Sequence, residues 1–387
     1  MIHFSGTLVM LTLLVFSDVP GVDAQKDAQT VSARKELESW YSAIAESGTP
    51  GFAVLVQQNG KPIFAKGYGL RDLRNHQPID EHTNFRLASC TKQFTAMAIM
   101  LLVHDGKLRY EESLTDIFPE FSAYGKTVTV RNLLNHTSGL PDYEDLMSAV
   151  EKEKGSLWSP ENQIRDSEVM QLLEEGHGKF TPGTKWEYSN SGYVILGLIV
   201  AKRSGKSFGN FLQERIFAPL QMNHTLVFEK GKNKIANRAY GHSRRDGKLV
   251  ETDQSSTSAT QGDGDIYSNL EDLGKWDDAL RNHTLLSQKE FATAITPVVL
   301  PLSAEQKLAE DAPESLRAKA LGYGFGWFLD LNSPHPLMWH YGDTMGFKTA
   351  ILRYLDSKLT VIVLGNRTDL DVGALALKTA NVIAKSH

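Results

Sequence analysis

The sequence holds a single cysteine, Cys90, among its 387 residues. One thiol cannot form an internal disulfide, so a small scaffold held together by cross-links is excluded. Basic side chains number 41 against 46 acidic ones, for a net charge of −5, and no cluster of Lys and Arg stands out. This balance predicts no nucleic-acid partner. No apolar run reaches the ~18 residues that a membrane-spanning helix needs, so we expect no stable membrane span in the mature chain.

The composition that is present is ordinary for a globular protein. Hydrophobic residues make up 41% of the chain and charged residues 22%. High apolar content with a small net charge excludes intrinsic disorder for most of the chain. A chain of this length can bury a full core, either as one large domain or as two lobes.

The N-terminal segment predicts secretion. Residues 8–16 form an apolar run, and small residues suited to signal peptidase follow it, ending at Ala24. We therefore expect a signal peptide over residues 1–24, cleaved after Ala24, and a secreted or periplasmic mature chain of residues 25–387. A disordered tail or a short anchor is the alternative, because the usual Lys or Arg ahead of the apolar run is missing.

Strand patterns lie at both ends of the sequence, and helical patterns lie between them. The pair Asn59-Gly60 predicts a tight hairpin turn between two strands. The predicted strands are residues 51–58, 61–68, 323–329, 337–341, 347–355 and 359–364. The predicted helices are residues 31–47, 87–104, 128–134, 169–174, 194–202 and 372–384.

This order of elements predicts an α+β fold. One antiparallel sheet would be built from both termini, about residues 25–86 and 318–387, with the terminal helices flanking it. A helical lobe of about residues 87–317 would be inserted between the two halves of the sheet. Two polar stretches, residues 229–262 and 303–320, have the composition of insertions.

Ser89 and Lys92 begin the long apolar helix. At a spacing of three residues the two side chains share one face, close enough to hydrogen-bond. A helix N-terminus favours the negative charge of a serine alkoxide, and a lysine kept neutral by burial can take the hydroxyl proton. The same spacing recurs at Ser32 and Lys35, in a helix expected to be solvated. We therefore favour Ser89 as a nucleophile, because a charge-capable pair in a buried helix needs an explanation.

Tyr188 and Asn190 supply a phenol and an amide. A phenolate beside a lysine ammonium can act as a base, and a phenol can protonate a leaving group. The same tripeptide recurs at residues 267–269, where Ser268 and Glu271 predict a capping box for the next helix. Spacing alone leaves the plain start of a helix as the alternative for Tyr188.

His340 and Gly342 lie on a predicted strand. A glycine there lets a substrate lie along the strand, and backbone N–H groups at such a strand can hold an oxyanion. A structural histidine at the strand end is the alternative. The competing sequence, residues 104–106, is better explained as a helix end with a glycine cap.

In this order the three pairs resemble a known family. The three motifs of the penicillin-recognising serine hydrolases are similar to Ser89-x-x-Lys92, Tyr188-x-Asn190 and His340-x-Gly342. The branch of interest holds class C β-lactamases, serine DD-carboxypeptidases, D-aminopeptidases and related esterases. The surroundings match as well, at residues 84–88, 133–140, 182–183, 264–276 and 324–327. The resemblance covers roughly residue 35 to the C-terminus and implies the same β-lactamase/transpeptidase-like fold with two lobes.

The resemblance also implies a role for each nucleophile-side residue. Ser89 corresponds to the acylated nucleophile, and Lys92 corresponds to its proton partner. Tyr188 corresponds to the general base and acid of this branch. Which of Lys92 and Tyr188 is the base stays open, because neighbouring groups titrate as a coupled set.

The remaining residues would contact the substrate. Asn190 corresponds to an amide contact, and His340 stands where a lysine is usual. The backbone N–H groups of Ser89 and of Asp343, the residue after Gly342, would form the oxyanion hole.

Two departures bear on the substrate. The third motif is His340-Tyr341-Gly342, where many members have Lys-Thr-Gly or Lys-Ser-Gly. A histidine carries at most a partial charge near neutral pH, and Tyr341 replaces a small hydroxyl that helps to hold a substrate carboxylate. Both changes weaken the case for a dedicated β-lactamase and favour an esterase or DD-peptidase.

The sequence thus predicts a secreted serine hydrolase that works through an acyl-enzyme on a small ester, amide or D-amino-acid peptide. The alternative is a non-catalytic or slowly turning-over sensor of cell-wall peptides or β-lactams on the same fold. We expect no cofactor and no metal, since Asp263 and Asp265 lack the spacing of a calcium loop. The expected partner is a small-molecule or peptide substrate, and the oligomeric state does not follow from the sequence.

Overall fold

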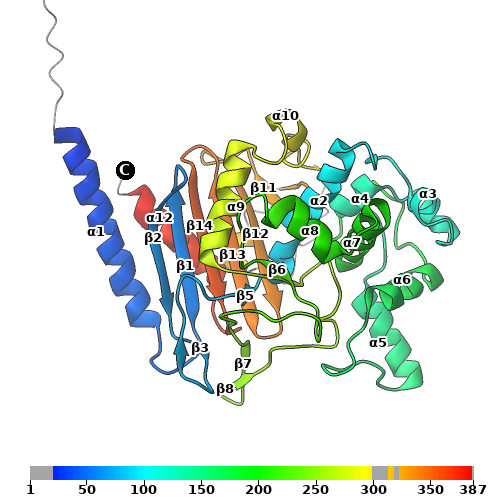
Figure 1. The fold of residues 1–387 in the computed structure, drawn as a ribbon, viewed down its shortest axis with the longest axis horizontal. Helices are drawn as coiled ribbons and strands as arrows, with labels where there is room; N and C mark the ends of the chain where they lie inside the picture. The colour runs from blue at the N-terminus through cyan, green and yellow to red at the C-terminus, as the bar shows by residue number, and fades with distance from the viewer. Residues whose placement is uncertain (1–20, 299–312, 318–321, 386–387) are drawn as a thin grey trace, which may run out of the picture.

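A seven-stranded antiparallel sheet forms the centre of the computed structural model, which describes residues 21–298, 313–317 and 322–385 (Figure 1). The strand order is β10-β11-β12-β13-β14-β1-β2. Its strands are β1 (Phe52–Gln58), β2 (Lys61–Tyr68), β10 (Gly322–Tyr323), β11 (Phe328–Asp330), β12 (Leu337–Thr344), β13 (Phe347–Tyr354) and β14 (Leu359–Gly365). Because β1 pairs along its whole length with β14, both ends of the chain meet in one sheet, which confirms the predicted architecture.

The β1–β2 hairpin follows from its local sequence. Asn59 and Gly60 have φ values of 51° and 76°, and a two-residue hairpin turn of the favoured type needs two positive φ values. Along β1 the side chains alternate, so that Leu55 belongs to the core on one face of the sheet and Val54 to the core on the other. Both faces are buried, which explains the nearly continuous apolar pattern of this strand.

Helices cover the two faces. On one face, α1 (Gly21–Ile44) packs on β2, and α12 (Val372–Ala384) packs on β13 and β14. On the other face, α9 (Leu270–Asn282) packs against β1 and β14 (Figure 1). Among the described residues, no helix has the length and apolar content to cross a membrane.

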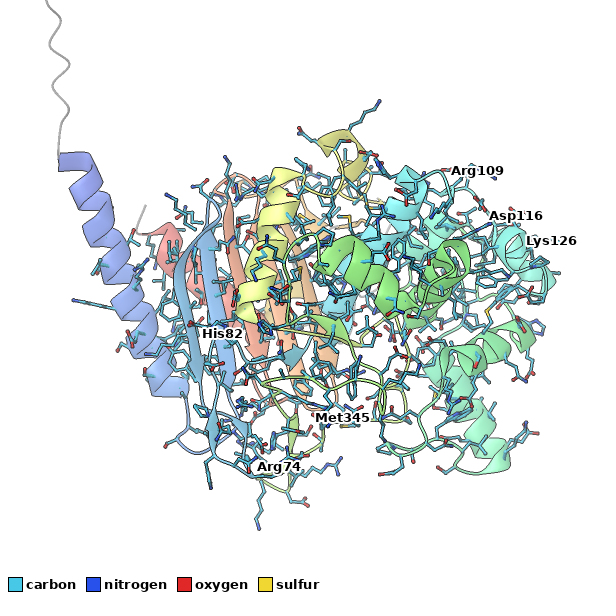
Figure 2. The ribbon with its side chains drawn as sticks, viewed as in Figure 1. Arg74, His82, Arg109, Asp116, Lys126 and Met345 are labelled. Carbon is cyan, nitrogen blue, oxygen red and sulfur yellow. The ribbon has the colours of Figure 1, made fainter. Side chains whose placement is uncertain are left out.

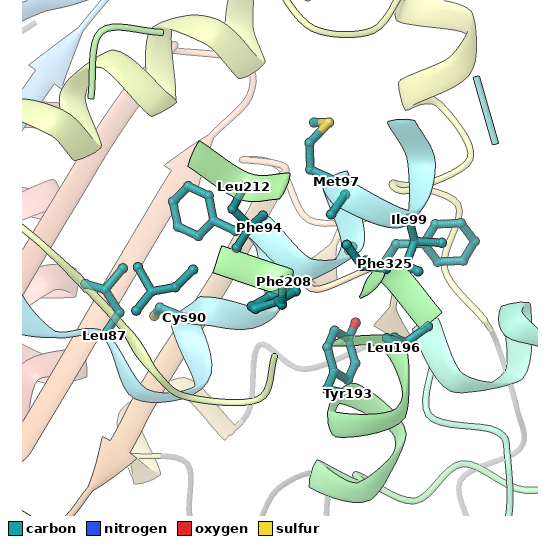
Figure 3. Close-up of a cluster of buried hydrophobic side chains, with 14 of the residues drawn as sticks. Leu87, Cys90, Phe94, Met97, Ile99, Tyr193, Leu196, Phe208, Leu212 and Phe325 are labelled. Atoms are coloured by element: carbon teal, nitrogen blue, oxygen red, sulfur yellow. The ribbon is translucent and has the colours of Figure 1, made fainter. Parts of the chain in front are cut away.

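The helical lobe is built around one buried helix. Its helices are α2 (Lys92–His104), α3 (Leu114–Ile117), α4 (Val130–Leu134), α5 (Tyr143–Lys154), α6 (Asp166–Glu175), α7 (Asn190–Ser204) and α8 (Phe208–Leu212). Helix α2 packs against α7 and α8, and the side chains of Phe94, Tyr193 and Phe208 lie in this core (Figure 3). Every residue of α2 from Lys92 to Leu102 is buried, so a lysine stands at the start of an apolar helix.

Short elements complete the described part of the chain. They are β3 (Leu70–Asp72), β4 (Gln77–Pro78), β5 (Phe85–Arg86), β6 (Leu226–Val227), β7 (His242–Arg245), β8 (Lys248–Glu251), β9 (Ile266–Ser268), α10 (Gln288–Phe291), α11 (Glu314–Arg317), the 3₁₀ helices η1 (Ala88–Thr91) and η2 (Ala123–Lys126), and the π-helical turn η3 (Gln213–Phe217). Strands β5, β9 and β6 form a small sheet that leads into η1.

Two predicted elements near the site differ in the structure. The single strand predicted over residues 323–329 is wrong, because β10 and β11 form a hairpin whose turn holds Gly326 at φ 77°. A Cβ at Gly326 would lie 2.8 Å from the Lys92 carbonyl oxygen, so this turn packs directly on the start of α2. The helix predicted over residues 87–104 begins as the 3₁₀ turn η1 before α2 continues it.

Other predicted details also change. Asn269, not Ser268, caps α9: its side chain accepts a hydrogen bond from the Asp272 N–H, while Ser268 is still paired in β9. The first helix begins at Gly21, ahead of its predicted start. The apolar run of the predicted signal peptide, residues 8–16, lies outside the described residues.

The polar stretch of residues 229–262 closes one end of the sheet. It contains the β7–β8 hairpin. Tyr240, two residues before β7, has its ring centroid 3.7 Å from the Arg74 guanidinium. Gly346 in the β12–β13 turn packs on Gly241 so closely that a Cβ would lie 2.5 Å from its Cα. Figure 2 shows Met345 of this turn at the same end of the molecule as Arg74. Most of the second polar stretch, residues 303–320, lies outside the described residues.

Candidate active site

Ser89 lies in a strained turn at the junction of the sheet and the helical lobe. The 3₁₀ turn η1 follows β5 directly, and Ala88, just before the serine, has a φ of 47°. A residue with a Cβ seldom adopts this conformation, and such strain is characteristic of functional sites. The neighbours Ala88 and Cys90 are buried, whereas Ser89 is half-buried. The turn therefore leaves the Ser89 side chain partly accessible, while the residues on both sides of it are buried.

Strand β12 lies against this turn. A Cβ at Gly342 would lie 2.2 Å from the Leu87 carbonyl oxygen and 3.0 Å from the Ala88 Cβ, so only glycine permits the approach. The Cys90 thiol lies 3.6 Å from the His340 carbonyl oxygen and donates to it. The structure thus brings the third predicted pair to the first, across 250 residues of sequence.

Lys92 is the hub of the site. Its Nζ donates to Ser89 Oγ at 3.1 Å, to Asn190 Oδ1 at 2.8 Å and to the Asp263 carbonyl oxygen at 3.0 Å. A protonated lysine has three N–H groups, one for each acceptor. After losing a proton, the amine keeps two donors and gains one lone pair that can face the serine hydroxyl. This coordination is compatible with both charge states of Lys92.

Burial decides the charge of Lys92. The side chain is fully buried, and the loss of hydration lowers its pKa to about 8. The negative charges of Asp263, Asp142 and Glu144 oppose this shift. A lysine with this pKa exchanges its proton near neutral pH, which is the requirement for acid–base work.

Tyr188 flanks the same pair. Lys92 Nζ lies 4.9 Å from the centroid of the Tyr188 ring, and the ring stacks on Phe328 of β11. Burial raises the pKa of the Tyr188 phenol well above its usual value, and the nearby Ser89 hydroxyl offsets only part of this rise. The phenol therefore keeps its proton at neutral pH. Asn190, two residues on, is the first residue of α7, and Ser189 caps that helix by accepting from the Gly192 N–H at 3.1 Å.

His340 is buried and neutral. Its Nδ1 lies 2.6 Å from the Tyr341 carbonyl oxygen and its Nε2 lies 3.0 Å from the Tyr323 hydroxyl. The carbonyl can only accept, so Nδ1 carries the proton and Nε2 accepts from the tyrosine. Burial lowers the pKa of His340 to about 3, so the third motif holds no positive charge at neutral pH. Asp343, exposed beyond Gly342, forms an ion pair with Lys348 at 3.0 Å.

Two residues of the site were missed as site residues from the sequence. The Asp263 carbonyl oxygen accepts from Lys92, while its carboxylate lies 3.0 Å from the Thr260 hydroxyl and 3.3 Å from the Tyr143 hydroxyl. His136 is buried beside Tyr188, with ring centroids 4.4 Å apart. A signal for His136 was present, because it lies in the matching stretch of residues 133–140.

The competing sequence repeats lie elsewhere. Ser32 and Lys35 are in α1, on the far side of the sheet from α2 (Figure 1). Residues 104–106 end α2, and Gly106 has a φ of 69°, as predicted for a helix cap. Residues 267–269 join β9 to α9. In the structure, one copy of each predicted pair therefore lies at the candidate site, and the repeated copies lie away from it.

Comparison with known proteins shows the family of this chain and the proteins that share its fold. The sequence profile of the family described as Beta-lactamase matches residues 28–384. Penicillin-binding protein 4* of Bacillus subtilis is 33% identical over 366 residues, which cover 90% of this chain and 76% of that protein. The octameric penicillin-binding protein homologue from Pyrococcus abyssi superposes with a TM-score of 0.73 at 24% identity, covering 94% of this chain and 78% of that one. The D-amino acid amidase from Ochrobactrum anthropi SV3, solved with L-phenylalanine amide, gives 0.71 at 25% identity, with 93% and 99% covered. The chain belongs to the beta-lactamase family.

Proposed function

We propose that this chain is a secreted or periplasmic serine hydrolase that forms an acyl-enzyme on Ser89. The observation that carries the proposal is the contact of Ser89 Oγ with the buried Lys92 amine at 3.1 Å, beside the Tyr188 ring. A nucleophile within hydrogen-bond reach of a base, with the base itself held by other groups, is the arrangement that covalent catalysis requires. Asn190 and the Asp263 carbonyl oxygen hold that base.

The charge states of Lys92 and Tyr188 support a particular order of proton transfers. With a pKa of about 8, a fraction of Lys92 is neutral at physiological pH and takes the proton as Ser89 Oγ bonds to the acyl carbon. Tyr188 keeps its phenolic proton and donates it to the leaving nitrogen or oxygen as the acyl bond breaks. The proton on Lys92 then restores the phenol. Water attacks the acyl-enzyme by the reverse transfers and frees Ser89.

The oxyanion of the tetrahedral intermediate would lie between η1 and β12. The backbone N–H groups of Ser89 and Asp343 are the proposed donors, since Gly342 packs against the residues just before Ser89. Removing one such donor typically costs about 10²–10³ in rate. Asn190 would contact the substrate amide.

The charge of the third motif supports one class of substrate. His340 is neutral and both of its ring nitrogens are engaged, so it offers no cation for a carboxylate. We infer a preference for esters and amides with an uncharged group beside the scissile bond, including amides of D-amino acids. The likeness to a D-amino acid amidase supports this class. Penicillins and cephalosporins, which carry a carboxylate, would be poor substrates.

Active-site labelling tests the proposal. Incubation with a fluorophosphonate, followed by peptide mass mapping, should place the label on Ser89 and leave the Ser89→Ala variant unlabelled. Turnover is then measured on a chromogenic ester, a D-amino acid amide, a D-alanyl dipeptide and a chromogenic cephalosporin. Hydrolysis of the first two above the last two is the expected order. A folded protein that is not labelled on Ser89 contradicts the proposal, and labelling without turnover of any substrate identifies a sensor.

A further inference from the structure

His136 occupies an unusual position beside the second motif. It lies in the loop after α4, its side chain is fully buried, and its φ is 61°. A histidine in the left-handed region is uncommon, and the surrounding fold must hold it there. The stretch of residues 133–140 was singled out from the sequence, but none of the proposed catalytic steps uses it.

His136 binds the backbone on both sides of Tyr188. Its carbonyl oxygen accepts from the Glu187 N–H at 3.0 Å, and its ring Nδ1 accepts from the Ser189 N–H at 3.1 Å. Between these two bonds its ring packs against the Tyr188 ring, with centroids 4.4 Å apart. The residue before the phenol, the phenol itself and the residue after it thus all contact one histidine.

Residues on both sides of His136 make further hydrogen bonds to the segment that holds Tyr188. The Thr137 carbonyl oxygen accepts from the Gly183 N–H at 2.8 Å, and the Leu134 carbonyl oxygen accepts from the Tyr193 hydroxyl at 2.8 Å. The tyrosine motif is therefore tied to the loop after α4 both before and after Tyr188. Because helix α7 begins at Asn190, these bonds also set where that helix starts.

We propose that His136 is the positioning residue for Tyr188, holding the phenol where it can exchange a proton with Lys92 and the leaving group. This inference rests on the proposed function and adds a residue to it. The phenol is buried and, within the described part of the chain, its hydroxyl has the Ser89 hydroxyl nearby but makes no hydrogen bond of normal geometry, so packing and backbone largely fix its place. A displacement of about 1 Å at such a group can cost 10²-fold in rate.

The ring state suits this role. Nδ1 must be unprotonated to accept from the Ser189 N–H, so the proton of the neutral ring is on Nε2. Burial and the nearby charge of Lys92 lower the pKa of His136 well below its usual value, which keeps the acceptor free. His136 therefore acts through Tyr188 and does not itself exchange a proton with the substrate.

Two substitutions at His136 distinguish the effect of losing the hydrogen-bond acceptor from the effect of disturbing the fold. His136→Asn keeps a backbone that tolerates positive φ and places Oδ1 near the position of Nδ1. His136→Gly also tolerates the φ but removes both the acceptor and the ring. We expect the acylation rate constant for a p-nitrophenyl ester, measured in single-turnover mode, to fall about 10²-fold in the glycine variant and less than 10-fold in the asparagine variant. The thermal midpoint of each variant shows that it is folded, and the asparagine variant replaces the glycine variant in the cycle below if the glycine variant is not.

A double-mutant cycle with Tyr188→Phe distinguishes positioning from a general structural effect. If His136 acts through the phenol, its substitution costs at most about threefold in the Tyr188→Phe background. Two losses that multiply, or a glycine variant that acylates at the wild-type rate, would overturn the inference. Failure of the proposed function appears separately, as a wild-type protein that is never acylated on Ser89.

Discussion

Replacing Gly342 by alanine tests the joint between β12 and the serine turn. The new Cβ would lie 2.2 Å from the Leu87 carbonyl oxygen, whereas real Cβ atoms essentially never come within 3.0 Å of such an atom. Strand and turn must therefore separate by about 0.8 Å at the position where the proposed oxyanion donors meet. Displacements of this size typically cost about 10²-fold when they act on aligned catalytic groups. We expect kcat/KM of Gly342→Ala to fall by about 10², mostly in kcat, with a stability loss of about 1–3 kcal/mol.

The assay compares this variant with Gly51→Ala. A Cβ at Gly51 would lie 2.0 Å from the Tyr68 carbonyl oxygen, an equally severe clash in the β1–β2 part of the sheet. Ester hydrolysis and the thermal midpoint are measured for both variants. Gly51→Ala should lose comparable stability while its folded fraction keeps wild-type kcat/KM. Equal losses of activity in the two variants, or a Gly342→Ala protein within threefold of wild type, would refute the reasoning.

Three further substitutions or conditions have defined outcomes. Because burial lowers the pKa of Lys92 to about 8 and the neutral amine is the proposed base, kcat/KM should rise with pH through about 8. Asp263→Asn removes a negative charge that raises the pKa of Lys92, so it should move the midpoint of this profile to lower pH. A midpoint that is higher or unchanged in the variant contradicts this reasoning. Burial raises the pKa of Asp166 to about 7, above the value that it has in the unfolded chain. Ionisation of this carboxyl therefore lowers the stability of the fold, and the loss is complete above about pH 7 and absent below about pH 4. Asp166→Asn keeps the oxygen that accepts from the Gln261 N–H at 2.9 Å. It should add up to about 4 kcal/mol of stability at pH 8, from about three pKa units at about 1.4 kcal/mol each, and should raise the thermal midpoint there but not at pH 4. Asn269→Ala removes the cap of α9 and should lower the unfolding free energy by about 1–2 kcal/mol in denaturant titrations, with kcat/KM unchanged.

The charge of the third motif is where sequence reasoning needed the structure most. From the sequence, His340 is a partly charged group near neutral pH. In the fold its ring is buried beside Phe328 of β11 and engaged at both nitrogens, so it is neutral at any physiological pH. The loss of charge comes first from burial and then from the nearby charge of Lys92. The Tyr323 hydroxyl, on a strand that was predicted with the wrong bounds, engages the Nε2 atom of His340. No spacing rule in the sequence predicts that Tyr323 contacts His340.

Local patterns were sufficient for the frame of the molecule. The Asn59-Gly60 turn, the strand β1 and the terminal helices depend on neighbouring residues, and each is present near its predicted place, although the first helix begins earlier, at Gly21. The spacing of Ser89 and Lys92 likewise places both side chains on one face of the chain, whatever surrounds them. These features follow from φ/ψ preferences and from helical and strand periodicity, which act over a few residues.

Tertiary structure alone decided how the pairs work together. Lys92 meets the Asp263 carbonyl oxygen across 171 residues, and His136 holds the Ser189 N–H across 53. The pKa of Lys92 depends on complete burial at the start of α2, which is a property of the packed lobe and not of the motif. The sequence by itself thus singled out the residues that we propose to carry the chemistry, through their types, their local spacing and the family resemblance of their order. The fold decided their charge and alignment, because desolvation and long-range contacts exist only once the sheet and the helical lobe have closed on each other.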